Sequence, residues 1–231
     1  MLEGYLPFLL DGARVTVLVA LLSFLGSIVF GLVAVTAKLS RVGVLRAVAG
    51  VYTTVMRGVP ELILILLIYF GLPILSQDVL RTLGFEGARV DLDPFVAGVF
   101  TLSLIYGAFT TEVLRGAYQA LSVGQIEAAK AIGMKPSRIA FRVVLPQMVP
   151  LCLAGMSNIW MVIVKATALM SAIQLDELMR KADLAAGATK RPFDMILAAA
   201  AIYLVITAVS VLVQHWLQHR VTTKRPKSYV V

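Results

Sequence analysis

The sequence predicts an all-α integral membrane protein with five transmembrane helices. Of its 231 residues, 59% are hydrophobic and only 15% are charged, whereas a soluble domain has roughly 25% charged residues. Long runs without charge alternate with short segments rich in Lys and Arg, a pattern typical of membrane proteins. The net charge of +8 is therefore interpreted as a topology signal and not as a sign of nucleic-acid binding. We expect one membrane domain over residues 1–231.

Five apolar runs are candidates for the spans, because a helix needs about 20 apolar residues to cross the hydrocarbon core of a bilayer. The second run includes Glu61 near its start, and the fourth includes Lys165. The expected spans are about residues 14–37, 58–77, 94–112, 146–173 and 193–217.

The basic segments predict the orientation, because Lys and Arg are enriched in cytoplasmic loops. Three segments carry most of this charge, namely the expected loops 38–57 and 112–142 and the C-terminal tail. Segment 76–93 has more acidic than basic residues and is expected outside, and segment 174–192 is mixed. We therefore expect the N-terminus outside and the C-terminus in the cytoplasm. The basic residues are Lys38, Arg41, Arg46, Arg57, Arg115, Lys130, Lys135, Arg138, Arg142, Arg220, Lys224, Arg225 and Lys227.

The connection over residues 113–145 has strong local signals for two helices. Ser122 followed by Gln125 is a capping-box pattern, and Gly133 suits a left-handed position at a helix C-terminus. Pro136 suits the first turn of a second helix. The sequence predicts a helix, a glycine turn and another helix, although from these signals alone the segment could be only a solvated connecting hairpin.

The same segment resembles the EAA signature of ABC-importer permeases. The matching residues keep the spacing of that signature, and they are Glu127, Ala128, Ala129, Gly133, Val143, Leu145 and Pro146. The stretches "MRGVPELILI", "YGAFTTEVLRGAYQAL" and "NIWMVIVKATAL" resemble the polar amino-acid branch, of the histidine/lysine/arginine/ornithine or opine permease type. One departure is Ala166, where many relatives in the wider branch have Asp.

The resemblance implies a type I importer permease fold in the bacterial inner membrane. It implies import of polar amino acids, with cationic ones expected, or of opines, and it implies that the segment around Glu127 acts as a coupling helix. The expected partners are two cytosolic ATPase subunits, an extracytoplasmic solute-binding protein, membrane lipid and a second permease subunit, for which a paralogue is preferred to an identical copy. The chain has no GxxxxGK[ST] run, so ATP and magnesium are expected on the partner ATPase and no cofactor on this chain.

Several polar residues at membrane depth are candidates for the translocation path: Glu61, Asn158, Lys165, Thr167 and Ser171. Intramembrane polar groups are costly unless they are paired, wetted or functional. Glu61 could instead pair with Arg57, and the polar fourth span could instead hold permease subunits together.

Other polar pairs have more ordinary interpretations. Glu112 and Arg115 have the spacing of an ion pair on one helix face. His215 and His219 are four residues apart, but no further ligands lie near them in the sequence, so no metal site is expected.

Two alternatives differ from a permease. An intramembrane hydrolase would need a nucleophile and a base that meet at membrane depth. Ser157 and Ser171 are candidate nucleophiles, but both histidines are expected at the cytoplasmic end of the last span. A passive channel or scaffold would not need an ATPase-docking helix.

Overall fold

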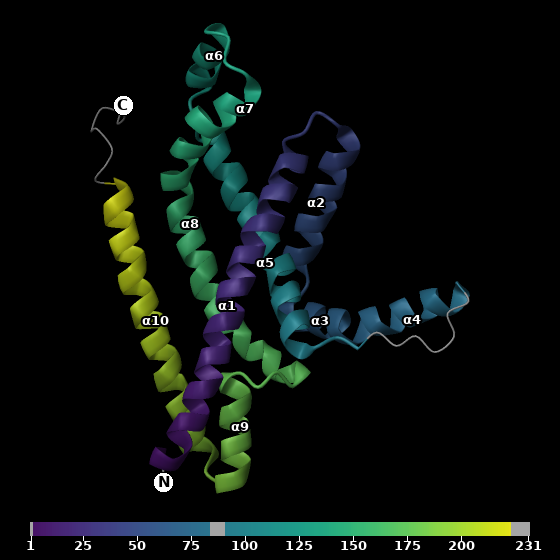
Figure 1. Cartoon of the computed structure of the whole chain (residues 1–231), viewed down its shortest axis with the longest axis vertical. Coiled ribbons are helices and arrows are strands. Elements are labelled where there is room, and N and C mark those ends of the chain that lie inside the picture. The colour runs from purple at the N-terminus through teal and green to yellow at the C-terminus, as the bar shows by residue number, and fades with distance from the viewer. Residues whose placement is uncertain (1, 84–90, 223–231) are drawn as a thin grey trace.

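The computed structural model describes residues 2–83 and 91–222, and this part of the chain is helical throughout, with short connections (Figure 1). The long helices are α1 (Leu2–Lys38), α5 (Pro94–Gln119), α8 (Leu145–Ala166) and α10 (Pro192–Thr222). The shorter elements are α2 (Gly43–Gly58), α3 (Glu61–Leu66), the π-helix η1 (Leu67–Gly71), α4 (Leu72–Thr82), α6 (Val123–Ala131), α7 (Pro136–Ile139), the π-helix η2 (Ala140–Val144), the 3₁₀-helix η3 (Thr167–Ile173) and α9 (Leu178–Thr189).

Five helical segments are long and apolar enough to cross a membrane, as predicted. They are Gly4–Lys38, Glu61–Thr82, Pro94–Gln119, Pro136–Ile173 and Pro192–Val221. Two segments that the sequence analysis treated as loops contain further helices, α2 and α9. Both segments are short and carry charged residues, so they did not resemble membrane spans. Each nevertheless buries one face, through Ala49 and Thr53 in α2 and through Leu178 and Ala182 in α9.

The core of the bundle is the packing of α1 against α5. Glycines allow this close approach: a Cβ atom added at Gly26 would lie 2.7 Å from the Cβ atom of Ser103, and one added at Gly107 would lie 2.5 Å from that of Phe30. Small residues at helix contacts are a common way to bring membrane helices together, because lipid provides no hydrophobic drive for association. The fully buried Ile105 of α5 belongs to the apolar cluster that continues this contact into α8.

The continuous segment α3–η1–α4, which we call the arm, projects away from the bundle at a steep angle to α1 and α5 (Figure 1). Within this chain α4 has no buried residue, and large apolar side chains such as Ile74 and Leu75 are each 60% exposed. The arm is therefore an apolar element with little packing inside its own subunit.

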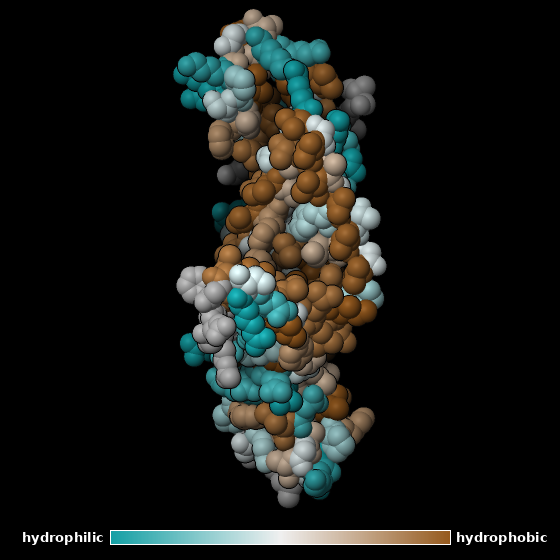
Figure 2. All heavy atoms as spheres, turned by 90° about the vertical axis from the view of Figure 1, so that its right-hand side faces the viewer, coloured by the Kyte–Doolittle hydropathy of each residue, from teal (hydrophilic) through white to brown (hydrophobic). Residues whose placement is uncertain are grey.

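The two ends of the bundle differ in what they carry. The end of α1, the start of α2, the α6–α7 connection and the end of α10 lie at one end, whereas the start of α1 and α9 lie at the other (Figure 1). On the face shown in Figure 2, hydrophobic residues gather mainly in the middle and hydrophilic residues mainly toward the ends. This distribution matches a protein that crosses a bilayer along the long axis of the bundle.

Candidate functional site: the α6–α7 loop and the polar groups of the bundle

The α6–α7 loop ends its first helix in a glycine turn. Gly133 has a φ of +75°, the left-handed conformation predicted from the sequence. Its N–H donates to the Lys130 carbonyl at 2.9 Å, and the Met134 N–H donates to the Ala129 carbonyl at 3.1 Å. These two bonds form a Schellman motif, which satisfies carbonyl groups that the end of a helix leaves free.

The start of α6 agrees with the prediction only in part. Ser122 is the N-cap residue, as predicted, but its side chain makes no capping hydrogen bond, so the capping box does not form. Pro136 opens α7, as predicted. The loop is consolidated by buried Ala129 and Ile139, whereas Glu127 and Ala128 are exposed.

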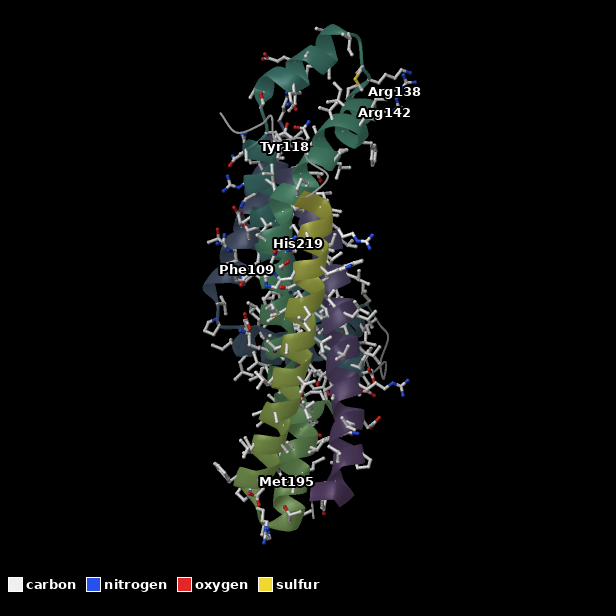
Figure 3. The ribbon with its side chains drawn as sticks, turned by 90° about the vertical axis from the view of Figure 1, so that its left-hand side faces the viewer. Phe109, Tyr118, Arg138, Arg142, Met195 and His219 are labelled. Atoms are coloured by element: carbon white, nitrogen blue, oxygen red, sulfur yellow. The ribbon has the colours of Figure 1, made fainter. Side chains whose placement is uncertain are left out.

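The loop presents apolar as well as charged side chains at the end of the molecule. Ile132 is 78% exposed and Phe141 is 71% exposed. In Figure 3, Arg138 and Arg142 lie at this end and Met195 lies at the opposite end. Exposed large apolar side chains beside cations, outside the apolar middle of the bundle, are typical of a protein docking surface.

The second helix of the loop continues directly into the fourth span, past both Leu145 and Pro146, which are exposed. The π-helix η2 precedes Pro146, whose ring nitrogen cannot donate a hydrogen bond. The side-chain amide of Gln147 donates to the Val143 carbonyl at 2.9 Å. Motion of the loop would therefore be passed to α8 through a continuous helix.

A cluster of charges joins the ends of three helices near the loop. Glu112 of α5 pairs with Lys38 at the end of α1 and with Arg115, whose guanidinium lies 2.8 Å away. The predicted Glu112–Arg115 pair is thus confirmed. Lys38 also donates to the hydroxyl of Thr53 in α2 at 2.8 Å. The cluster ties α1, α2 and α5 together.

Glu61 is not paired with Arg57, so that alternative from the sequence analysis is wrong. The Glu61 carboxylate accepts a hydrogen bond of 2.8 Å from the hydroxyl of buried Tyr106. The Arg57 guanidinium instead lies over the ring of Phe109, 5.4 Å from its centroid. Arg57 precedes the short break between α2 and α3, and its side chain contacts α5 through Phe109.

The polar residues of the fourth span lie on different faces. Asn158 and Lys165 are exposed and seven residues apart, which places them on one side of α8. Thr167 is fully buried, and Ser171 is partly buried in η3. Ala166 is buried.

Sequence reasoning missed a fully buried carboxylate, that of Glu177, at the N-terminus of α9. It accepts hydrogen bonds from the backbone N–H groups of Met179 and Arg180, each at 2.8 Å, and from the Tyr203 hydroxyl at 3.0 Å. The Thr16 hydroxyl lies 3.4 Å from the same carboxylate. Burial raises the pKa of Glu177, although these hydrogen bonds oppose the shift. The signal in the sequence was weak, because Glu is not a favoured N-cap residue.

The Glu177 cluster borders a small cavity that includes Lys165. Tyr203 links them, since its hydroxyl donates to the Glu177 carboxylate and the residue also lines the cavity. The Tyr203 hydroxyl is also 3.5 Å from the Thr167 hydroxyl. The cavity has a volume of about 250 Å³. Its lining residues are Lys165, Ala168, Met179, Ile196, Ala199, Ala200 and Tyr203.

Comparisons with curated proteins match nearly the whole chain. It is 43% identical over 210 residues to the histidine/lysine/arginine/ornithine transport system permease protein HisQ of Salmonella typhimurium, covering 91% of each chain. It is 44% identical over 208 residues to the nopaline transport system permease protein NocQ of Agrobacterium fabrum, covering 90% of this chain and 88% of that protein.

Comparisons with solved structures give the same architecture. A chain from the crystal structure of an amino acid ABC transporter with histidines has a TM-score of 0.80 and 30% identity, with 95% of this chain and 96% of that chain covered. A chain of the MetNI methionine ABC transporter in an inward-facing conformation has a TM-score of 0.74 at 18% identity, which supports the fold alone.

The family description "binding-protein-dependent transport system inner membrane component" matches residues 15–223. This agrees with the resemblance that the sequence predicted, and nothing in the comparisons supports an intramembrane hydrolase or a passive channel. The protein is a transport subunit of the inner membrane, and it belongs to the family of binding-protein-dependent transport system inner membrane components.

Proposed function

We propose that this chain is a permease subunit that imports polar, cationic amino acids or opines, and that its α6–α7 loop receives the force of a partner ATPase. The observation that carries the proposal is the geometry of the loop. Glu127 and Ala128 are exposed on a helix that ends in a Schellman turn, at an end of the molecule with exposed Ile132 and Phe141. The substrate class rests on the names of the similar permeases, which transport histidine, lysine, arginine, ornithine and opines.

The proposed complex contains two ATPase subunits, which bind ATP and magnesium, a solute-binding protein and a second permease subunit. The exposed apolar arm supports the presence of a second permease, because it has little packing within this chain. A paralogue is preferred to an identical copy. The α1–α2 connection, the α6–α7 loop and the end of α10 with Arg220 lie at one end of the bundle, and their basic residues favour a cytoplasmic location for that end. The binding protein would then meet the end that carries α9.

Gly133 provides the test of coupling. A Cβ atom added there would meet no atom within 4 Å, so a substitution acts through the backbone alone. A β-branched residue is poorly compatible with a positive φ, and the strain is on the order of 1–3 kcal/mol. Gly133→Val should disturb the turn and mis-aim α6, whereas Gly133→Asn should be tolerated because Asn adopts the left-handed conformation readily.

The measurement is ATPase activity and substrate uptake by the reconstituted importer, with and without loaded binding protein. We expect Gly133→Val to lose most of the stimulation by binding protein and most of the uptake, while the complex still assembles. Gly133→Asn should resemble the wild type. Full stimulation and uptake in Gly133→Val would show that the loop is only a connector.

For the translocation path we propose that Lys165 and the cavity beside it face the route of the substrate, together with Glu61, Asn158, Thr167 and Ser171. The exposed ammonium of Lys165 at membrane depth supports this role. Lys165→Met should reduce uptake in an assembled complex, and Lys165→Arg, which keeps the positive charge, is the control. Normal uptake by Lys165→Met would remove Lys165 from the route, and loss of assembly would indicate a contact between subunits.

A further inference from the structure

An apolar groove between α1, α8 and α10 is separate from the loop and from the Lys165 cavity. Its volume is about 630 Å³. In Figure 1, α10 lies close to the start of α1 and diverges from α1 toward its own C-terminal end. The groove is lined by Val17, Leu21, Phe24, Leu153, Met156, Ser157, Trp160, Val205, Ile206, Val209, Ser210, Val213, Gln214 and Leu217.

Two polar side chains in this lining, those of Ser210 and Gln214, bond to backbone carbonyl groups of the protein. The Gln214 side chain donates to the Ser157 carbonyl at 3.2 Å, and the Ser210 hydroxyl donates to the Ile206 carbonyl at 2.8 Å. These groups hold the groove together and leave its wall almost wholly apolar. The groove therefore suits a hydrocarbon chain and not a polar substrate.

The length of the groove matches one leaflet of the bilayer. On α10 the lining runs from Val205 to Leu217, which is about 18 Å at a rise of about 1.5 Å per residue. One leaflet provides about 15 Å of hydrocarbon, half of a core about 30 Å thick. A transmembrane helix of a partner would need the full thickness, so the length favours a single acyl chain.

A basic group lies just beyond the groove at the C-terminal end of α10. The Arg220 guanidinium lies 4.7 Å from the centroid of the Trp216 ring. Among the residues that the structure describes, no carboxylate lies within ion-pair distance of Arg220. Figure 3 shows His219 at this end of α10. Trp and Arg are typical of the membrane–water interface, and basic groups there attract anionic headgroups.

We propose that this groove binds an anionic phospholipid, with one acyl chain between α1, α8 and α10 and the phosphate beside Arg220. The lipid fills the groove that these three helices line. The apolar side chains that line the groove hold the acyl chain. The guanidinium of Arg220 favours an anionic headgroup over a neutral one.

Matched substitutions on α1 test the acyl-chain site. Leu21 lines the groove and is 44% exposed, whereas its neighbour Leu22 does not line it and is 41% exposed. Leu21→Trp should fill the groove, and Leu22→Trp is the control. Arg220→Gln tests the headgroup site separately. The assembled importer is purified from mixed phosphatidylglycerol and phosphatidylcholine nanodiscs, delipidated with detergent and examined by native mass spectrometry.

We expect the wild type and Leu22→Trp to retain phosphatidylglycerol several-fold over phosphatidylcholine. Leu21→Trp should retain several-fold less of both lipids, and Arg220→Gln should retain lipid without a preference between the headgroups. Wild-type retention by Leu21→Trp would overturn the proposal. Dissociation of the second permease from Leu21→Trp, but not from Leu22→Trp, would show that the second permease occupies the groove. That result would also overturn the lipid proposal.

Discussion

Tyr203 of α10 donates a hydrogen bond of 3.0 Å to the buried carboxylate of Glu177, the residue that caps α9. Thr16 of α1 contributes to the same cluster, since its hydroxyl also accepts from the Leu178 N–H at 3.2 Å. Two membrane-spanning helices thus hold the start of α9 through a single acidic side chain.

Removing the Tyr203 hydroxyl should loosen α9. A hydrogen bond to a charged group contributes about 1.5–3 kcal/mol, so Tyr203→Phe should lower the melting temperature of the purified complex and speed proteolysis within α9. Tyr69→Phe, in the arm, is the control. Equal melting and proteolysis for Tyr203→Phe and the wild type would mean that the hydrogen bond contributes nothing to holding α9.

The docking of α9 should depend on pH through Glu177. Burial raises its pKa in the folded state above the ordinary value for Glu, so the folded protein holds this proton more tightly than the unfolded chain. The contribution of Glu177 to the free energy of unfolding is therefore fully present below the pKa that Glu177 has in the unfolded chain. This contribution is lost as the pH rises through the pKa that Glu177 has in the folded protein. Glu177→Gln lacks this titration, so its melting temperature relative to the wild type should rise with pH across that window. A difference that stays constant or falls with rising pH would contradict the expectation.

The contact between α1 and α5 should be sensitive to a single methyl group. At Gly26 an added Cβ atom would lie 2.7 Å from the Cβ atom of Ser103, and overpacking of this kind typically costs 1–3 kcal/mol. Gly26→Ala should therefore lower the melting temperature, and the double variant Gly26→Ala/Ser103→Gly should recover part of the loss. Gly50→Ala, where an added Cβ atom meets nothing within 4 Å, should be neutral or stabilising. No recovery in the double variant would show that Ser103 is not the obstacle.

The orientation can be tested by labelling cysteines in intact cells, in a Cys152→Ser background. Arg46 and Ser137 are exposed at one end of the bundle, and Ala188 is exposed at the other, near the end of α9. We expect an impermeant thiol reagent to label Ala188→Cys in intact cells, and Arg46→Cys and Ser137→Cys only after permeabilisation. Labelling of Ser137→Cys in intact cells would reverse the proposed orientation. Segment 76–93 is a poorer choice for the outer site, because Glu86 lies outside the described residues.

Local signals in the sequence predicted local structure well. The apolar runs predicted the number of spans, and the lone glycine of the loop predicted the left-handed turn at Gly133. Both depend on neighbouring residues and on backbone sterics alone. The capping box at Ser122 was wrong, because the Ser122 side chain makes no capping hydrogen bond.

The features that could not be predicted depend on contacts between distant segments. Glu177 meets Tyr203 and Thr16 across 26 and 161 positions in the chain, and no local pattern indicates such a cluster. The Glu61 carboxylate accepts a hydrogen bond from Tyr106 of α5 and does not pair with Arg57, which is nearer in the sequence. The angle of the arm is likewise a matter of packing, because its sequence is simply that of an apolar helix.

The arm has a consequence for how cells handle this subunit. Only 11% of the apolar stretch of the arm is buried in its own chain, so a partner subunit that covered the arm would add contacts that this chain alone lacks. The subunit's abundance should then follow the supply of its partners, because binding that covers the arm stabilises only the folded subunit. Synthesis of this chain alone would give a short-lived orphan, and the stoichiometry of the importer would be set after translation by selective degradation of the excess.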